Sequence, residues 1–111
     1  MIKRGEVYWA AFDPAVGGEI RKTRPTVVVS NDVNNVHSPT VTILPLSLAV
    51  QRVYPFEVFL AAETCGNKND CKVKVDQIRA VDKRRLGDLV GQVPDFLMDD
   101  IAKALRCHLS L

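Results

Sequence analysis

A run of short strands followed by one long helix is the feature that most limits how this chain can fold. Six short segments rich in β-branched and aromatic residues come first: 7–12, 26–30, 40–46, 56–60, 72–75 and 77–81. Beyond residue 94, Leu97, Ile101 and Leu105 recur every four residues, which predicts an amphipathic helix whose apolar stripe packs on a core. Short strands with long connections indicate a mainly β protein with a small, curved sheet or partial barrel, and the helix would cover one face of it.

The connections between these elements are also predicted from their composition. Residues 13–23 contain a proline and two adjacent glycines without a helical repeat, so we expect a long loop. Residues 31–39 are rich in asparagine and end in proline, which predicts a second loop. Asp82 is placed to cap a short helical turn that continues to residue 89.

Size and composition favour a single soluble domain over residues 1–111. The chain is 47% hydrophobic and 25% charged, as in ordinary globular proteins, and has no apolar run of about 18 residues that could span a membrane. Its first residues lack the apolar core of a signal peptide, so we expect a cytoplasmic protein. Cys65 and Cys71 bracket a loop and could bridge if oxidised, but three cysteines without an export signal favour reduced thiols. No spacing of Cys and His predicts a metal site, and we expect no cofactor.

Positive charge gathers locally, although the net charge is only +2. Arg21, Lys22 and Arg24 form one cluster, and residues 83–85 form a second. A nucleic acid needs only a local cationic patch, because binding releases counterions from the phosphates there. A solvated charged surface is the alternative explanation of each cluster.

Three side chains would meet if adjacent strand ends share one rim of the sheet: Glu19, Arg24 and Ser47. Such a set suits RNA cleavage, because RNA carries its own nucleophile in the 2′-hydroxyl. Arg24 would stabilise charge on the phosphorus, Ser47 would donate to a phosphate oxygen, and Glu19 would take the proton of the nucleophile. Taken singly, each residue also has an ordinary structural role at a strand end, in a turn or on the surface.

Ordered motifs run through nearly the whole chain: RGEVYW (4–9), DP (13–14), GGE (17–19), RPTVVVSND (24–32), LPLS (44–47), YPFEV (54–58) and DQIR (76–79). This set resembles the MazF/PemK toxin endoribonucleases. The resemblance implies an SH3-like barrel with a C-terminal helix, a homodimer, and sequence-specific cleavage of single-stranded RNA. It further implies cleavage without a metal that leaves a 2′,3′-cyclic phosphate and a 5′-hydroxyl. The partner it implies is a cognate antitoxin whose extended acidic segment occupies the RNA groove.

The same resemblance assigns residues to roles. The family's catalytic arginine falls on Arg24, and its catalytic hydroxyl, commonly a threonine, falls on Ser47. The glutamate that some members use as a base falls on Glu19. Further candidates for RNA contact, from the resemblance and from the composition of the loops, are Arg21, Lys22, Asn31, His37, Arg52 and Gln77.

Two other functions remain possible from the sequence. A gyrase poison of the related CcdB type would share the fold, but it would depend on a C-terminal helix ending with aromatic and acidic character. The last five residues of this chain, 107–111, include no aromatic residue. A non-catalytic RNA-binding barrel would use the same side chains only to position phosphates.

Overall fold

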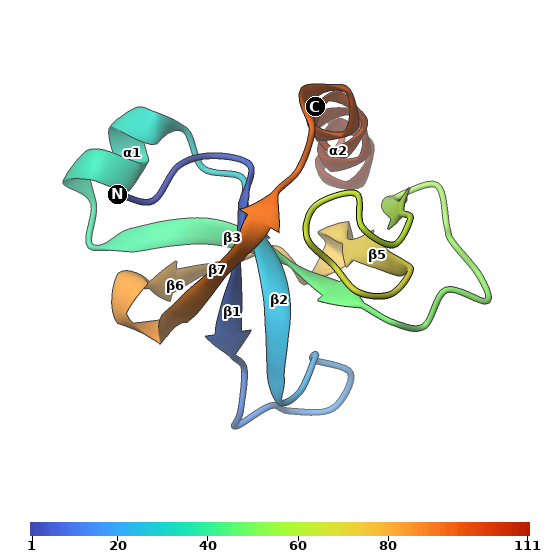
Figure 1. The fold of residues 1–111 in the computed structure, drawn as a ribbon, viewed down its shortest axis with the longest axis horizontal. Coiled ribbons are helices and arrows are strands. Elements are labelled where there is room, and N and C mark those ends of the chain that lie inside the picture. Colours follow the sequence, from blue (N-terminus) through green and yellow to red (C-terminus); the bar gives the residue numbers. More distant parts are fainter.

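The computed structural model describes residues 1–111 and is dominated by antiparallel strands (Figure 1). All seven strands belong to one open sheet in which the order β4-β5-β3-β2-β1-β7 is continuous and β6 pairs with β3. The strands are β1 (Glu6–Ala11), β2 (Thr23–Val28), β3 (Thr40–Ser47), β4 (Glu57–Leu60), β5 (Cys71–Lys74), β6 (Arg79–Asp82) and β7 (Leu86–Gln92). The expectation of a mainly β fold with a C-terminal helix is therefore confirmed.

Strand β3 organises the sheet because it pairs with three others. Its register with β2 sets Thr26 opposite Pro45 and Val28 opposite Ile43. Along its other edge the first half of β3 pairs with β6, and its end pairs with β5. Both strand ends that carry the predicted catalytic residues thus lie beside each other at one end of the sheet.

The predicted C-terminal helix is present as α2 (Asp95–Leu109), and it packs against β4 and a short 3₁₀ turn at residues 75–77. Its Met98, Ile101 and Ala104 enter a core of fifteen buried residues that includes side chains from β1 to β5. Leu109, which continues the four-residue spacing beyond Leu105, is instead 46% exposed. No helix in the structure combines the length and the apolar character needed to cross a membrane.

The asparagine-rich segment 31–39 is not wholly a loop, because it contains the short helix α1 (Asp32–His37). The Asn31 side chain accepts a hydrogen bond from the Asn34 amide and caps the first turn. Asn35 is buried, and its side chain donates to the backbone oxygen of Ser30 at 3.0 Å. Asparagine and aspartate favour helix caps as well as turns, and here the capping role prevails.

Residues 82–92 also differ from the expectation. Asp82 does cap a 3₁₀ turn, accepting from the Arg84 amide at 2.8 Å, but the turn ends at Arg85. The following residues form strand β7, which pairs with β1 and sets Glu6 opposite Gln92. Two glycines and an aspartate give β7 a weak intrinsic strand preference, so its pairing with β1 determines its structure. Gln77, predicted in a strand, closes the 3₁₀ turn before β6.

Candidate active site

Arg24 and Ser47 lie at neighbouring strand ends, as the sequence predicts. The observed pairing of β2 with β3 runs from Val28 opposite Ile43 to Thr26 opposite Pro45. Arg24 lies two residues before Thr26 and Ser47 lies two residues after Pro45, just beyond the last pair of the two strands.

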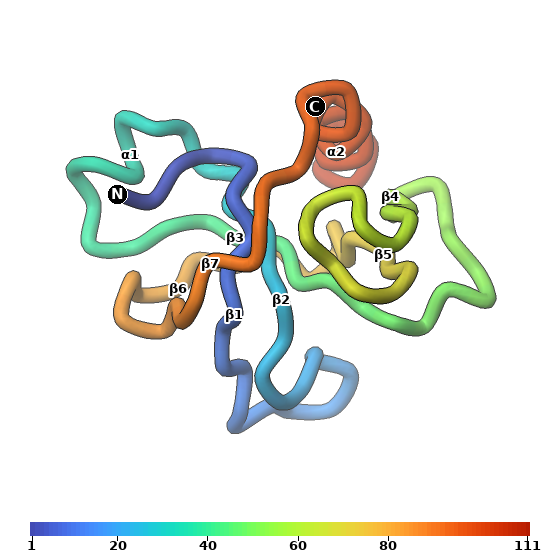
Figure 2. Tube along the Cα trace, in the orientation of Figure 1, coloured from blue at the N-terminus to red at the C-terminus, as the bar shows by residue number.

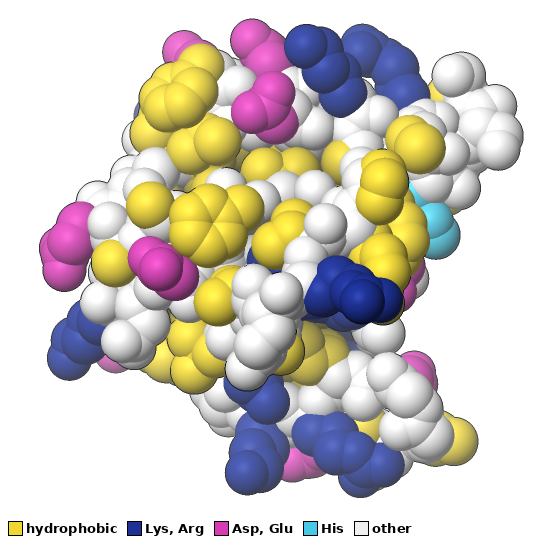
Figure 3. Space-filling model, turned by 90° about the vertical axis from the view of Figure 1, so that its right-hand side faces the viewer, with side chains coloured by type: hydrophobic (Ala, Val, Ile, Leu, Met, Phe, Trp, Pro, Cys, Tyr) yellow, Lys and Arg dark blue, Asp and Glu magenta, His cyan; other side chains and the backbone are white.

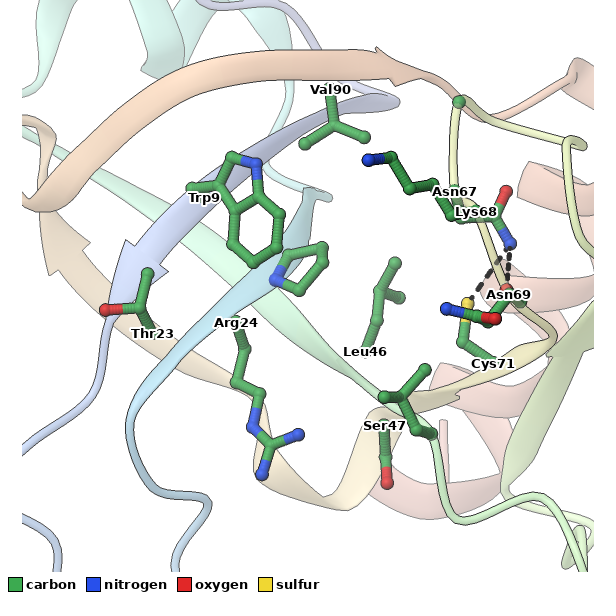
Figure 4. A pocket seen from close by; sticks show the side chains of 13 residues that line it. Trp9, Thr23, Arg24, Leu46, Ser47, Asn67, Lys68, Asn69, Cys71 and Val90 are labelled. Carbon is green, nitrogen blue, oxygen red and sulfur yellow. Dashed lines mark hydrogen bonds between the residues drawn. The ribbon is translucent and has the colours of Figure 1, made fainter.

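Both side chains line one cavity of about 640 Å³ (Figure 4). Its walls come from β1, β2, β3, the loop that precedes β5, and β7. The lining residues are Trp9, Thr23, Arg24, Pro25, Leu46, Ser47, Leu48, Gly66, Asn67, Lys68, Asn69, Cys71 and Val90. In Figure 4 the Arg24 guanidinium and the Ser47 hydroxyl point toward the same side of the cavity, away from Trp9.

The Arg24 guanidinium is anchored at one nitrogen only. Its Nε donates to the backbone oxygen of Arg21 at 3.1 Å, and neither Nη group has a partner in the chain. A guanidinium fixed in this way presents its two terminal nitrogens as a fork, which matches two oxygens of a phosphate.

The Ser47 hydroxyl is oriented by the next turn of the chain. Its Oγ accepts a hydrogen bond from the Ala49 amide at 3.2 Å. Because the oxygen accepts there, its own proton stays free to donate to a ligand. Ser47 is half-buried, so the hydroxyl remains accessible from the cavity.

A buried ion pair supports the floor next to Ser47. Lys72, which pairs with Ser47 across β5 and β3, contacts Glu57 at 3.0 Å. Its Nζ also donates to the backbone oxygen of Arg52 at 2.8 Å, while the Tyr54 amide donates to Glu57 at 3.0 Å. The pair therefore ties the 48–56 loop to the sheet beside the site.

The thiol of Cys71 reaches the cavity but is not activated. Burial, and then the neighbouring Cys65 thiol, raises the pKa of Cys71 to about 11. Asn67 lies between the two sulfurs, accepting from Cys65 Sγ at 3.3 Å and donating to Cys71 Sγ at 3.5 Å. A thiol with a raised pKa stays protonated near neutral pH and is a poor nucleophile.

Glu19 does not line the cavity of Arg24 and Ser47; it lines a second cavity of about 680 Å³ together with Gln77 and Arg79. Its carboxylate accepts from the Val16 amide at 2.7 Å. Gln77 holds the same loop with both ends of its amide: Oε1 accepts from the Ile20 amide at 3.3 Å, and Nε2 donates to the Gly18 oxygen at 3.2 Å. The structure thus brings two of the three predicted catalytic residues into one cavity and places the third elsewhere.

The remaining candidates for RNA contact are spread over the surface. Arg21 and Lys22 are exposed on the β1–β2 loop, where Arg21 donates to the Gly17 oxygen at 3.4 Å. Asn31 caps α1, and His37 is exposed in the last turn of that helix. Arg52 is exposed with its guanidinium 5.7 Å from the centre of the Tyr54 ring.

The loop before β5 adds residues to the cavity that local sequence patterns do not predict. Lys68 and Asn69 lie in a polar stretch between two cysteines, and that stretch draws attention to the thiols instead. The sequence feature that points to Lys68 and Asn69 is a basic residue among asparagines in a glycine-containing loop, because binding residues often lie on loops. Trp9 is 44% exposed on the opposite wall.

Lys and Arg side chains form one group at the lower end of the face that carries the 48–56 and 61–70 loops, at the level of the β1–β2 loop in Figure 1. Figure 3 shows further Lys and Arg side chains at the upper end of this face, with hydrophobic side chains between the two ends. No group of three or more His, Cys, Asp or Glu side chains is arranged to hold a metal ion.

Comparisons with known proteins agree along the whole chain. Residues 3–109 match the family model described as PemK-like, MazF-like toxin of type II toxin-antitoxin system. The chain is 38% identical to endoribonuclease MazF9 of Mycobacterium tuberculosis (strain ATCC 25618 / H37Rv), covering 100% of this chain and 98% of that protein. It is 36% identical to endoribonuclease EndoA of Bacillus subtilis (strain 168), covering 100% and 97%.

Solved structures are similar over the same length. A crystal structure of MazF from Deinococcus radiodurans matches with a TM-score of 0.86 and 25% identity, covering 99% of this chain and 97% of that one. An endoribonuclease in complex with its cognate antitoxin, from a mycobacterial species, matches with a TM-score of 0.83 and 27% identity, covering 100% and 97%.

Proposed function

The chain belongs to the PemK/MazF family of type II toxin–antitoxin toxins, and from this premise we propose that it is an endoribonuclease that cuts single-stranded RNA at specific sequences without a metal. The observation that carries the proposal is the meeting of Arg24 and Ser47 in one cavity, with the guanidinium fork and the hydroxyl proton both free.

The reaction is an attack of the substrate on itself. The 2′-oxygen of one ribose bonds to the adjacent phosphorus and gives up its proton to a base. The bond between phosphorus and the 5′-oxygen of the next nucleotide breaks, and that oxygen takes up a proton. The products are a 2′,3′-cyclic phosphate and a 5′-hydroxyl, so DNA, which lacks the nucleophile, is not cut.

Arg24 and Ser47 act on the charge that grows on the phosphate oxygens as the fifth bond to phosphorus forms. Arg24 donates through both Nη groups, and Ser47 donates its free proton to a non-bridging oxygen. Donors held in place before the reaction stabilise this charge without reorganising, which is commonly the largest contribution to such catalysis.

Glu19 is the proposed base for the 2′-proton. Its carboxylate accepts from the Val16 amide in the free chain, so it must leave that contact to reach the nucleophile. Gln77 also holds the flanking residues Gly18 and Ile20, so RNA binding must rearrange these contacts for Glu19 to act as the base.

The partner proposed for the toxin is a cognate antitoxin whose extended acidic segment lies over the cationic end of the site. A similar solved structure is an endoribonuclease bound to its cognate antitoxin, which supports this partner. We further infer a homodimer from the family, and sedimentation of the purified chain measures it directly. A monomer at micromolar concentration would contradict this inference.

Cleavage of a long single-stranded RNA in excess EDTA tests the proposal. We expect metal-independent cuts with 2′,3′-cyclic phosphate ends, and a loss of about 100- to 1,000-fold in rate for Arg24→Ala, because one preorganised donor is removed. Glu19→Gln should lose about 100-fold if Glu19 is the base. Lys103→Ala, on the exposed side of α2, is the control for surface charge.

The outcomes separate the alternative functions. Intact RNA that nevertheless binds tightly would favour a non-catalytic RNA-binding barrel, and trapped gyrase complexes would favour a gyrase poison. Cleavage that survives Arg24→Ala would contradict the proposed site. Unchanged cleavage by Glu19→Gln across the pH range would remove Glu19 from the mechanism and leave the other roles intact.

A further inference from the structure

We propose that the cavity of Arg24 and Ser47 also reads one base of the RNA next to the cut, and that Lys68 and Asn69 recognise it while Trp9 forms its apolar wall. The inference rests on the proposed function and goes beyond it, because it assigns part of the sequence specificity to the loop before β5. This segment, residues 61–70, is called the β4–β5 loop below.

The cavity has the size and lining that a nucleotide needs. Its volume of about 640 Å³ falls within the usual range for small-molecule sites. Trp9 stands 44% exposed on one wall, and Leu46 and Val90 add apolar surface. An exposed indole beside a cationic group is a platform on which a base can stack.

Two polar side chains of the β4–β5 loop face the cavity without partners. The Lys68 ammonium and the Asn69 amide make no hydrogen bond or ion pair within the chain, and in Figure 4 both point into the cavity. Asn67 differs, since its amide is engaged with the Cys65 amide and with the backbone oxygens of Ala61 and Asn69. Asn67 therefore shapes the loop, and its two successors are free for a ligand.

The loop is fixed against the last strand, as Figure 2 shows at the upper end of β7. A Cβ on Gly66 would lie 2.4 Å from the Val90 oxygen, and one on Gly91 would lie 2.2 Å from the Cys65 oxygen. Backbone passes against backbone at both points, so the loop rests directly on β7 and cannot approach it further. This contact supports the loop that carries Lys68 and Asn69, as a site that discriminates between bases requires.

Charge favours RNA as the occupant. The thirteen lining residues include two cations, Arg24 and Lys68, and no acidic residue. An acidic antitoxin segment would also be attracted by these charges. Arg24 and Ser47 line the same cavity, however, so any group that fills it lies next to the phosphate that these two residues hold. A base that flanks the cut meets this condition.

The donors define the kind of base. An ammonium only donates hydrogen bonds, so Lys68 selects a base that presents a keto oxygen. The Asn69 amide oxygen then accepts from the ring N–H next to that keto oxygen, a pairing that uracil and guanine offer and cytosine and adenine do not. We therefore assign the cavity to uracil or guanine at one position beside the cut.

Mapping the cut sites of the wild-type protein, Lys68→Ala and Asn69→Ala on a long mixed-sequence RNA tests this assignment. We expect each variant to lose the preference for uracil or guanine at one flanking position. The kcat/KM for the preferred sequence should fall about tenfold, while cutting of sequences that lack the base changes little. Lys103→Ala, an exposed lysine that lines none of the three cavities, should keep the wild-type preference.

Three results would overturn the inference. The cut-site preference could survive both substitutions. The rate could fall equally on all sequences, as expected if Lys68 only neutralised phosphate. The variants could keep their preference and lose only the binding of an acidic antitoxin peptide, which would make the cavity a peptide site. A wild-type protein that leaves RNA uncut would instead refute the proposed function, so the two failures are distinguishable.

Discussion

Amide side chains, instead of regular secondary structure, position the loops around the candidate active site. Gln77 engages the backbone of Gly18 and Ile20 in the β1–β2 loop, and Asn67 does the same for the β4–β5 loop. An amide carries one acceptor and two donors in a plane, so it can substitute for a neighbouring strand where none is available. At the scale of single residues, the two loops are therefore positioned by polar contacts of one side chain each, and a substitution of that side chain would remove them.

Ser47 gives the residue-scale prediction. Replacing it by alanine removes one donor to the developing charge, and we expect kcat to fall about tenfold, less than for Arg24→Ala. Ser47→Thr keeps the hydroxyl and should retain activity near the wild-type level. Single-turnover cleavage at saturating protein measures both variants. An inactive threonine variant that still folds would show that residue 47 does not act through its hydroxyl.

At the scale of elements, the Glu57 carboxylate joins β4, β5 and the 48–56 loop. It contacts Lys72 at 3.0 Å and Lys74 at 2.8 Å, and its side chain has no exposed surface. Burial by itself would raise the pKa of Glu57, yet hydrogen bonds from Lys74, the Tyr54 amide and Lys72 outweigh it, so the pKa lies below its ordinary value. The charged carboxylate is thus the form that the folded chain favours.

The pH dependence of stability follows from that direction. A depressed pKa in the folded chain adds stability above the ordinary value of 4.5, and this stability is lost as the pH falls through the lower folded value. Glu57→Gln should remove this acid dependence and lower the free energy of unfolding at pH 7 by about 3 kcal/mol, because Lys72 is left buried without its partner. Urea denaturation at several pH values measures both effects. Exposed Glu63, replaced by Gln, is the control, and an equal loss there would contradict the assignment.

The elements also show what local sequence can predict. The sequence predicts α2 from its repeat of apolar residues and β2 from its dense run of β-branched residues, and both patterns agree with how the elements pack. β7 was missed because residues with a weak strand preference are paired to β1, a partner about eighty residues away that local patterns do not reveal. Only part of the cavity lining is predictable from sequence, for the same reason. Arg24 and Ser47 sit at recognisable strand ends, whereas Lys68 and Asn69 reach the cavity through the contact of the β4–β5 loop with β7.

At the scale of the whole molecule, the chain is joined end to end by its first and last strands. β1 pairs with β2 on one side and with β7 on the other. The β4–β5 loop then packs against β7 where Gly66 and Gly91 allow the two backbones to approach. One wall of the cavity thus depends on residues from both ends of the sequence.

Gly91→Ala tests this contact. The added Cβ would meet the Cys65 carbonyl at a distance that requires the backbone to shift, so we expect a loss of about 1–3 kcal/mol in the free energy of unfolding. Gly18→Ala is the matched control, since no atom lies within 4 Å of its Cβ position. Thermal and urea denaturation of the three proteins measure the difference. Equal stability of the two variants would mean that the close approach is not a constraint.

The pairing of β1 with β7 has a consequence for how the protein is made. A chain still being synthesised holds Arg24 and Ser47 long before it holds the strand on which the β4–β5 loop rests. Until residues 86–92 have left the ribosome, the first strand lacks one neighbour and the cavity lacks one wall. The cavity that Arg24 and Ser47 line is therefore complete only when synthesis of the chain is nearly finished.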